Sequence, residues 1–276
     1  MKSDFRIYHP VVNLIYCIAV VFFTMFFMNP VFIVISFGTS FFCASYFRGM
    51  ENVRKYFKGI FIIAAAACLI NPLFNHRGSS VLTYLPTGNP VTLESMIFGV
   101  FSGLIISGVI VWFYGFNELM PTDKVIYLFG GVFPMLSLVF SMTVSFVQLL
   151  KTRLFEINSA QRAFYLEGEK PVKKALISFK VILNRSLEES VETAVSMRGR
   201  GFGLKGRTSF SIYNFEEKDA KAAAVLMGLS AAITAGILNK SMNFFYFDKF
   251  AVSFSIYGII CSVCFGLICM FPFLVR

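Results

Sequence analysis

The chain has 276 residues, of which 57% are hydrophobic and only 14% are charged, and its formal net charge is +10. Soluble domains usually carry about 25% charged residues, so this composition excludes a water-soluble globular protein and predicts an integral membrane protein. In a soluble chain the basic excess would indicate a nucleic-acid partner. In a membrane protein it is typical of loops held in the cytoplasm, so no nucleic-acid partner is expected.

Six apolar segments are predicted to cross the bilayer as α-helices, since one span takes about 20 residues. No cleavage site of small residues follows the first segment, so we interpret it as a transmembrane helix rather than a signal peptide. The fourth carries Gly99, Gly103 and Gly108, which would let a neighbouring helix approach closely. Residues 75–93 are expected to form a polar external loop. The predicted spans are residues 11–28, 31–47, 59–74, 94–116, 220–238 and 250–275.

A further apolar segment, residues 123–150, is ambiguous. Its hydrophobicity favours a span, whereas Gly130, Gly131 and Pro134 favour a break in its middle. If it crossed the bilayer, the strongly basic residues 151–207 would lie outside, which the charge bias of membrane proteins disfavours. We therefore predict that it stays at the cytoplasmic interface, which gives six spans. Seven spans are the alternative.

The distribution of basic residues also predicts the orientation. Lys2 and Arg6 place the N-terminus in the cytoplasm. Only Arg77, Lys240 and Lys249 then lie at or near the outside, and the other 22 of the 25 Lys and Arg lie inside. We expect an all-α, multi-pass protein of the plasma membrane, with both termini and residues 121–218 in the cytoplasm. The predicted parts are membrane helices 1–120, a cytoplasmic or interfacial coupling-helix module 121–218, and membrane helices 219–276.

Residues 151–207 are the only long polar run and hold twelve of the 25 basic residues. Together with the apolar residues before it, this run predicts two long helices. The first begins near Pro134 and ends before Gly168, and Pro171 suits the first turn of the second. Apolar residues of the second helix recur at steps of three and four and form one face. That face consists of Leu176, Phe179, Leu183, Leu187, Val191, Ala194 and Met197.

Each of the two helices ends in a short motif that we interpret as a partner-binding site. An arginine between two glycines, such as Arg200, can reach a partner carboxylate in bidentate geometry. Basic helices lying on anionic lipid are an alternative with equal support from the physics alone. The first motif is Ala160, Gln161, Arg162, Ala163, Phe164 and Tyr165. The second is Met197, Arg198, Gly199, Arg200, Gly201 and Phe202.

These motifs resemble those of the transmembrane T component of energy-coupling factor (ECF) transporters. That family ends two coupling helices in Ala-Arg-Gly or similar triplets, and residues 196–202 match the second with glycine in place of alanine. The first matches at Ala160, Gln161 and Ala163 and departs at Phe164-Tyr165, where Arg-Gly is expected. Either Arg162 or the aromatic pair would then make that contact.

The resemblance implies a scaffold without catalytic residues or a cofactor of its own. Such a T component bridges two ATP-binding-cassette ATPases and a substrate-binding membrane protein, the S component, which takes up a vitamin or a metal ion. The two helix ends would sit in grooves on the ATPases. The apolar surface of the insertion, including residues 132–147, would carry the S component.

Other functions find less support in the residues. The glycine-rich residues 201–208 lack the Gly-Lys-Ser/Thr of a phosphate-binding loop. His9 and His76 are expected on opposite sides of the membrane and Cys261-x-x-Cys264 has apolar neighbours, so no metal site is expected. An intramembrane enzyme or a self-contained secondary transporter, the alternative function, would need ionisable residues within the spans.

Overall fold

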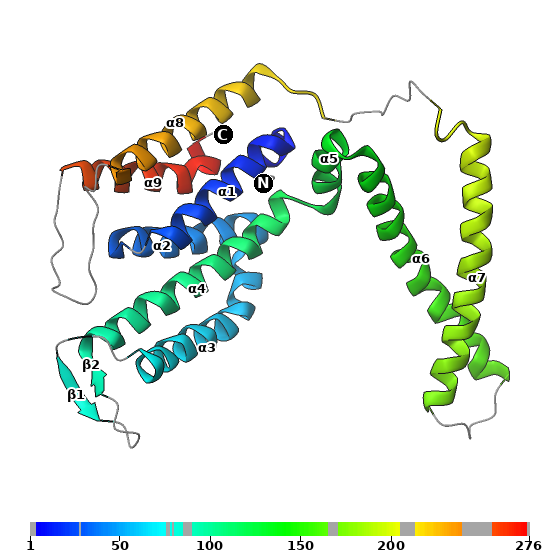
Figure 1. Cartoon of the computed structure of the whole chain (residues 1–276), viewed down its shortest axis with the longest axis horizontal. Helices are drawn as coiled ribbons and strands as arrows, with labels where there is room; N and C mark the ends of the chain where they lie inside the picture. Colours follow the sequence, from blue (N-terminus) through cyan, green and yellow to red (C-terminus); the bar gives the residue numbers. More distant parts are fainter. Residues whose placement is uncertain are drawn as a thin grey trace. The chain divides into compact units, whose positions relative to one another are not determined.

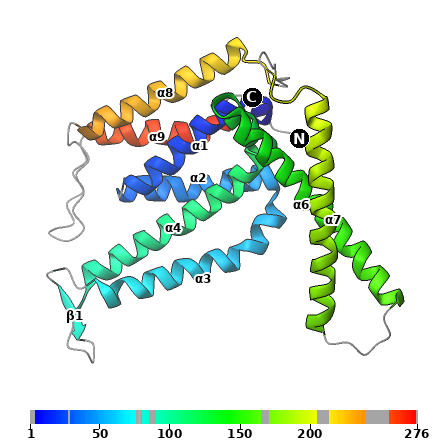
Figure 2. The same ribbon diagram turned by 45° about the vertical axis from the view of Figure 1, so that its right-hand side comes forward.

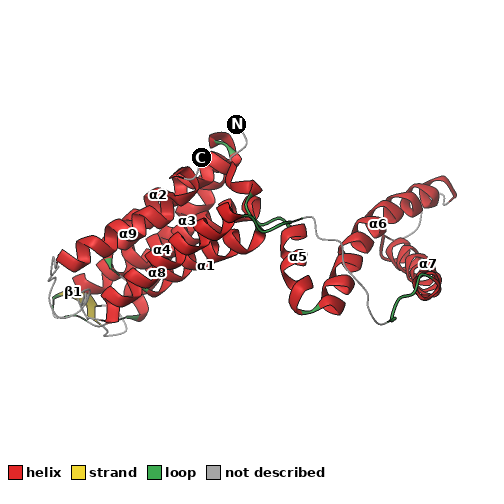
Figure 3. Ribbon diagram, turned by 90° about the horizontal axis from the view of Figure 1, so that it is seen from above, coloured by secondary structure: helices red, strands yellow, loops and turns green. Residues whose placement is uncertain are grey.

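The computed structural model describes residues 4–27, 29–75, 78, 80–84, 90–164, 171–204, 213–238 and 256–274. Within these ranges the chain is α-helical apart from one short 3₁₀ helix, Asp4–Ile7, and one β-hairpin (Figure 3). The all-α fold predicted from the sequence is therefore confirmed. The chain divides into two compact units, Met1–Val125 with Tyr213–Arg276, and Ile126–Ile212. The predicted boundaries near residues 120 and 218 stay predictions.

The first unit is a helical bundle, in which α3 and α4 lie side by side in both views (Figure 1 and Figure 2). Helices α2 and α4 also pack closely, and α9 contacts α8 and α2. The bundle helices are α1 (Pro10–Phe26), α2 (Pro30–Arg48), α3 (Met50–Phe74), α4 (Leu93–Leu119), α8 (Glu217–Leu238) and α9 (Ile256–Leu274).

The ends of the first helices follow from local sequence signals. Pro30 is the first residue of α2, and the Oδ1 atom of Asn29 accepts a hydrogen bond from the N–H of Val31 at 3.0 Å. An asparagine cap followed by proline is a common helix start. Gly49 has φ +85° and is the single residue between α2 and α3. A left-handed conformation suits glycine, which has no Cβ, and it permits this abrupt change of direction.

Aromatic side chains fill the centre of the bundle. Trp112, Tyr16, Phe32 and Phe265 are all less than 2% exposed. The rings of Phe32 and Phe265 stack at 4.8 Å between α2 and α9, and the indole N–H of Trp112 donates to the Oγ of Ser36 at 3.0 Å. A buried indole usually needs such a partner, so Ser36 lets the tryptophan anchor α4 against α2.

Two glycines set the close approach of α3 and α4. A Cβ on Gly99 would lie 2.8 Å from the carbonyl oxygen of Cys68, and one on Gly103 would lie 2.7 Å from that of Ala64. Both distances are too short for a side chain, because the backbone of α3 occupies the space. A Cβ on Gly108 would make only an ordinary contact of 3.7 Å with Phe37. The expectation of close helix approach thus holds at the first two glycines.

Five described helices are long and apolar enough to cross a membrane, as judged by length and composition. Such a set indicates a multi-pass membrane protein. Four of them, α2, α4, α8 and α9, coincide with predicted spans. Two other predicted spans correspond to shorter apolar helices, Pro10–Phe26 and Lys58–Phe74. The fifth, Pro134–Ala163, overlaps the segment that we placed at the interface on charge grounds, so the number of crossings stays a prediction.

The loop expected between the third and fourth spans contains a β-hairpin instead. Strands β1 (Val81–Tyr84) and β2 (Pro90–Thr92) pair antiparallel, with Val81 opposite Thr92. The carboxylate of Glu94 accepts hydrogen bonds from the N–H (3.2 Å) and the hydroxyl (2.8 Å) of Ser80, which joins the hairpin to α4. Strands of three and four residues are too short to give an alternating pattern, so the sequence analysis missed them.

The glycine contacts give a first prediction. Gly103→Ala forces a Cβ into the carbonyl of Ala64, and overpacking of this kind costs about 1–3 kcal/mol. We therefore expect this variant to lower the melting temperature of the purified protein by several degrees. Gly108→Ala makes the same change in the same helix where room exists, and it is expected to leave the melting temperature unchanged or to raise it. Equal melting temperatures for the two variants would contradict the close approach.

Candidate partner-binding helix ends

The second unit is built from the end of α5 (Thr122–Val132), with α6 (Pro134–Phe164) and α7 (Pro171–Gly199). Phe133 separates α5 from α6, which confirms the break predicted from Gly130, Gly131 and Pro134. The hydroxyl of Ser137 donates to the carbonyl oxygen of Ile126 at 2.9 Å and bridges the break. Pro134 cannot continue α5, because it lacks the backbone N–H that a helix interior needs.

Two polar contacts join α6 to α7. The guanidinium of Arg153 forms an ion pair with the carboxylate of Glu189, and Arg185 lies 3.4 Å from the same carboxylate. Nearer the loop between the helices, the hydroxyl of Ser178 is 3.1 Å from Oδ1 of Asn158. The hydrogen bond from Arg153 is the main cause that holds the pKa of Glu189 below its usual value.

These contacts place the two motifs at opposite ends of the α6–α7 pair. Asn158 is close to the end of α6, whereas its partner Ser178 is close to the start of α7. At a rise of 1.5 Å per residue, Gly199 lies about 30 Å beyond Ser178 along α7. Figure 1 shows α6 and α7 crossing near the first of these ends. The structure therefore keeps the motifs apart rather than joining them in one site.

The second motif ends α7 in a defined turn. The N–H of Phe202 donates to the carbonyl oxygen of Met197 at 3.0 Å, and the N–H of Gly201 donates to that of Arg198 at 3.0 Å. Gly201 itself has φ +84°. This pair of hydrogen bonds around a left-handed glycine is a Schellman motif, which satisfies the last carbonyl groups of a helix. Arg200 is the residue directly before that glycine, so it caps the helix.

The side chains of this turn face outward. Arg198 and Arg200 are exposed, and neither forms an ion pair with a described residue. A Cβ on Gly199 would meet nothing within 4 Å, so the chain itself does not require glycine there. Met197 is half-buried and Phe202 is 40% exposed. The turn therefore carries two exposed arginines on either side of a glycine that has open space around it.

The first motif lies at the end of α6 and is only partly described. Ala160, Arg162 and Ala163 are exposed, and Arg162 has no ion pair among the described residues. Gln161 is half-buried, and its amide nitrogen has no hydrogen-bond partner there. Phe164 is the last residue of α6. Tyr165 lies outside the described residues, as do residues 205–212 after the second motif.

Both helices carry apolar side chains that no described residue covers. The stripe predicted along α7 is present, and Leu176, Phe179 and Val191 on it are all more than 60% exposed. On α6, Met135 and Leu136 are exposed to a similar degree. Apolar surface of this extent usually marks contact with a membrane or a protein partner. The apolar surface expected at residues 132–147 is therefore present.

One charged cluster at the end of the first unit was missed by the sequence analysis. The carboxylate of Glu118 lies 3.1 Å from Arg6 and 3.4 Å from Arg48, and the ammonium of Lys124 donates to the carbonyl oxygen of Arg6 at 2.7 Å. Burial, with the nearby charge of Arg6, lowers the pKa of Lys124. The only sequence signal was an acidic residue at the end of an apolar run. The cluster ties the N-terminus to α2, α4 and the first turn of α5.

A second link involves Asp219 at the start of α8. Its carboxylate accepts hydrogen bonds from the N–H of His9 at 2.9 Å and from the N–H of Glu216 at 3.0 Å. The ring of His9 also lies edge-on to that of Phe215 at 5.2 Å. His9 therefore has a structural role at the start of α1. No group of three or more metal-ligating side chains occurs in the part of the chain that the structure describes.

Comparison with known proteins does not identify a family for this chain. No protein-family model matches the chain, and no curated protein matches it in sequence.

The contact between α6 and α7 gives a pH prediction. Because Arg153 holds the pKa of Glu189 down, the ion pair stabilises the α6–α7 contact above the ordinary glutamate pKa. This contribution is lost as the pH falls through the lowered pKa. In wild-type protein we expect the protection factors of the α7 amides to fall in acid, so that their exchange slows less with decreasing pH than the intrinsic, base-catalysed rate does.

Glu189→Gln should exchange faster already at neutral pH and lose this extra acid dependence. Glu192→Gln is the matched control, because Glu192 is exposed on the same helix and forms no ion pair with a described residue. It should behave as wild type. An identical pH dependence in wild type and Glu189→Gln would show that the pair does not hold the helices together.

Proposed function

We propose that this chain is the transmembrane scaffold subunit of an ECF-type importer, in which α6 and α7 couple two partner ATPases to a substrate-binding S component. The single observation that supports it best is the pair of exposed basic helix ends at opposite ends of α6–α7. Two separated sites suit two ATPase subunits. The alternative, a basic helix lying on anionic lipid, would need no defined turn at its end.

The second helix end has the chemistry for a protein groove. Arg198 and Arg200 project from a turn held by backbone hydrogen bonds, and glycine at 199 leaves space for a partner surface. A guanidinium that enters a carboxylate-lined groove forms short, bidentate hydrogen bonds. Neither arginine would have to give up an ion pair with a described residue in order to bind.

In the proposed mechanism, the ATPases change their separation when they bind and hydrolyse ATP, and each carries one helix end with it. Because α6 and α7 touch at few polar contacts, such a movement changes the angle at which they cross. The exposed apolar faces of α6 and α7 would pass this change to the S component, which releases its vitamin or metal ion inside the cell. This is rigid-body coupling between packed elements.

Charge reversal at the second helix end tests the proposal. Arg200→Glu places a carboxylate in an acidic groove, so we expect co-purification of the ATPase subunits from the membranes of the source cell to fall at least tenfold, and substrate uptake to stop. Contacts of this kind contribute about 2–5 kcal/mol when one charge is left unpaired. Quantitative mass spectrometry of the purified complex measures the ratio of subunits.

Lys151→Glu is the control, since Lys151 is an exposed cation on α6, nine residues before the first motif, and forms no ion pair with a described residue. It should keep the ATPases bound. Both variants should reach the membrane in wild-type amounts. Normal ATPase assembly in Arg200→Glu, or uptake that persists without any nucleotide-hydrolysing partner, would refute the proposal and favour a self-contained transporter.

A further inference from the structure

An apolar groove lies on the outer face of α2, beside the start of α3. It has a volume of about 760 Å³ and is lined on α2 by Gly38, Phe41, Phe42, Ser45 and Tyr46, and on α3 by Met50, Val53 and Arg54. The α2 residues recur at steps of three and four, so they share one helix face. Ligand sites in proteins usually have volumes of about 300–1,000 Å³.

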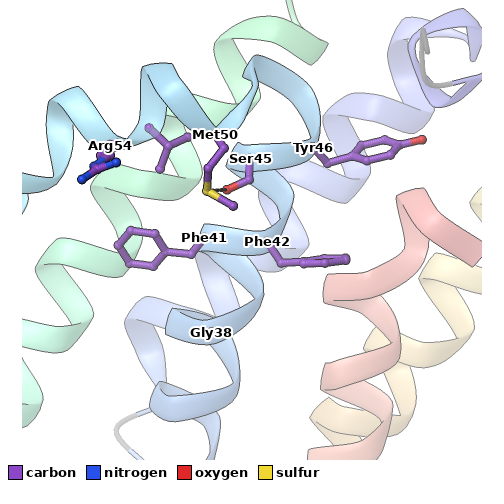
Figure 4. A pocket seen from close by; sticks show the side chains of 8 residues that line it. Gly38, Phe41, Phe42, Ser45, Tyr46, Met50 and Arg54 are labelled. Atoms are coloured by element: carbon purple, nitrogen blue, oxygen red, sulfur yellow. Dashed lines mark hydrogen bonds between the residues drawn. The ribbon is translucent and has the colours of Figure 1, made fainter.

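The hollow is produced by Gly38 and bounded by aromatic rings. A Cβ on Gly38 would meet nothing within 4 Å. Figure 4 shows Phe41 and Phe42 pointing to opposite sides above Gly38. The rings of Phe42 and Tyr46 lie 4.8 Å and 4.6 Å from that of Phe273 in α9, which closes one side.

The polar end of the groove is at Arg54. The guanidinium of Arg54 is exposed and has no ion pair or hydrogen bond with a described residue. Arg48, at the end of α2, is different: it lies 3.4 Å from Glu118 and 4.3 Å from the ring centre of Tyr114. Of these two cations near the junction of α2 and α3, only Arg54 lines the groove and remains available for an anion.

The dimensions of the groove fit one leaflet of a bilayer. From Gly38 to Tyr46 the groove follows α2 for about 12 Å, at 1.5 Å per residue. The hydrocarbon of one leaflet is about 15 Å thick. Tyr46 near the basic end has the position that tyrosines commonly take at the membrane–water boundary. Apolar lining with one unpaired cation at its end therefore matches an amphiphile with an anionic head.

We propose that this groove binds an anionic phospholipid of the cytoplasmic leaflet, with an acyl chain over Gly38 and the headgroup phosphate on Arg54. Arginine binds phosphate oxygens in bidentate geometry. The hydroxyl of Ser45 is 3.6 Å from the sulfur of Met50 (Figure 4). The flexible Met50 side chain therefore lines the groove between the proposed positions of the headgroup and the acyl chain. This inference does not depend on the function proposed above.

The test is native mass spectrometry of the whole purified protein after exchange into detergent with phosphatidylglycerol or phosphatidylcholine of identical acyl chains. Wild type should retain phosphatidylglycerol preferentially. Arg54→Gln should lower retention of phosphatidylglycerol about fivefold, since one basic residue near a membrane surface contributes about 1 kcal/mol. It should lower retention of phosphatidylcholine much less, because the choline cation offsets the charge of its phosphate, and Arg54→Lys should stay close to wild type.

Two matched control variants distinguish binding in the groove from the effects of basic charge or side-chain size elsewhere on α3. Lys58→Gln removes another exposed cation of α3 that does not line the groove, and should keep the preference. Gly38→Leu should fill the hollow and lower retention of both lipids. Gly59→Leu should not, because Gly59 also faces open space but lies outside the groove.

Four outcomes would overturn the proposal. Equal losses in Arg54→Gln and Lys58→Gln would indicate diffuse basic charge, and unchanged retention in Gly38→Leu would place the lipid elsewhere. Displacement of phosphatidylglycerol by millimolar inorganic phosphate would indicate an anion site without a lipid. A stable dimer that loses lipid on association would make the groove an interface between copies.

Discussion

The contact between α6 and α7 is the constraint on which the proposed mechanism depends. The described polar contacts are few, with the carboxylate of Glu189 held by Arg153 and Arg185, and a hydrogen bond between Ser178 and Asn158. The second helix end lies about 30 Å from Ser178 and about 15 Å from Glu189 along α7, so a rotation of about 10° at the crossing moves it by roughly 3–5 Å. A small change at the crossing is therefore converted into a large displacement at the partner site.

The two units of the chain differ in how much apolar surface they bury. The first has a core of buried aromatic residues that includes Trp112, which is anchored to Ser36, and it places glycines at the interface of α3 and α4. The second leaves apolar residues of α6 and α7 exposed. A bundle with a packed core suits a stable support, whereas uncovered apolar helix faces suit surfaces that bind partners. The charged cluster around Glu118 holds the first turn of α5 to the first of these units.

The sequence predicted those features that depend on local chemistry. Hydrophobic runs predicted the bundle helices, Pro134 with Gly130 and Gly131 predicted the break, and the second motif marked the end of α7. It did not predict the hairpin, whose strands are too short for a periodic pattern, or the contacts of Glu118 and Asp219. These contacts join residues far apart in the chain, and a single sequence carries no signal for such pairs. The groove over Gly38 likewise depends on the position of α9.

The candidate partner-binding site was likewise predicted only in its local features. The second motif was recognised from its glycine and arginine spacing, and the structure adds that its arginines are exposed and that its turn is fixed by backbone hydrogen bonds. The separation of the two motifs could not be predicted, because it depends on which residues of α6 and α7 touch. The partners themselves stay a proposal, since nothing in the chain identifies them directly.

Photo-cross-linking from the two helix ends in living cells tests the central claim most directly. A photoreactive amino acid at position 199 or 162 is expected to form covalent adducts with nucleotide-binding ATPase subunits, and the same amino acid at position 151 is not. Adducts formed only with lipid, or labelling of position 199 by a membrane-impermeant reagent added outside intact cells, would contradict the account.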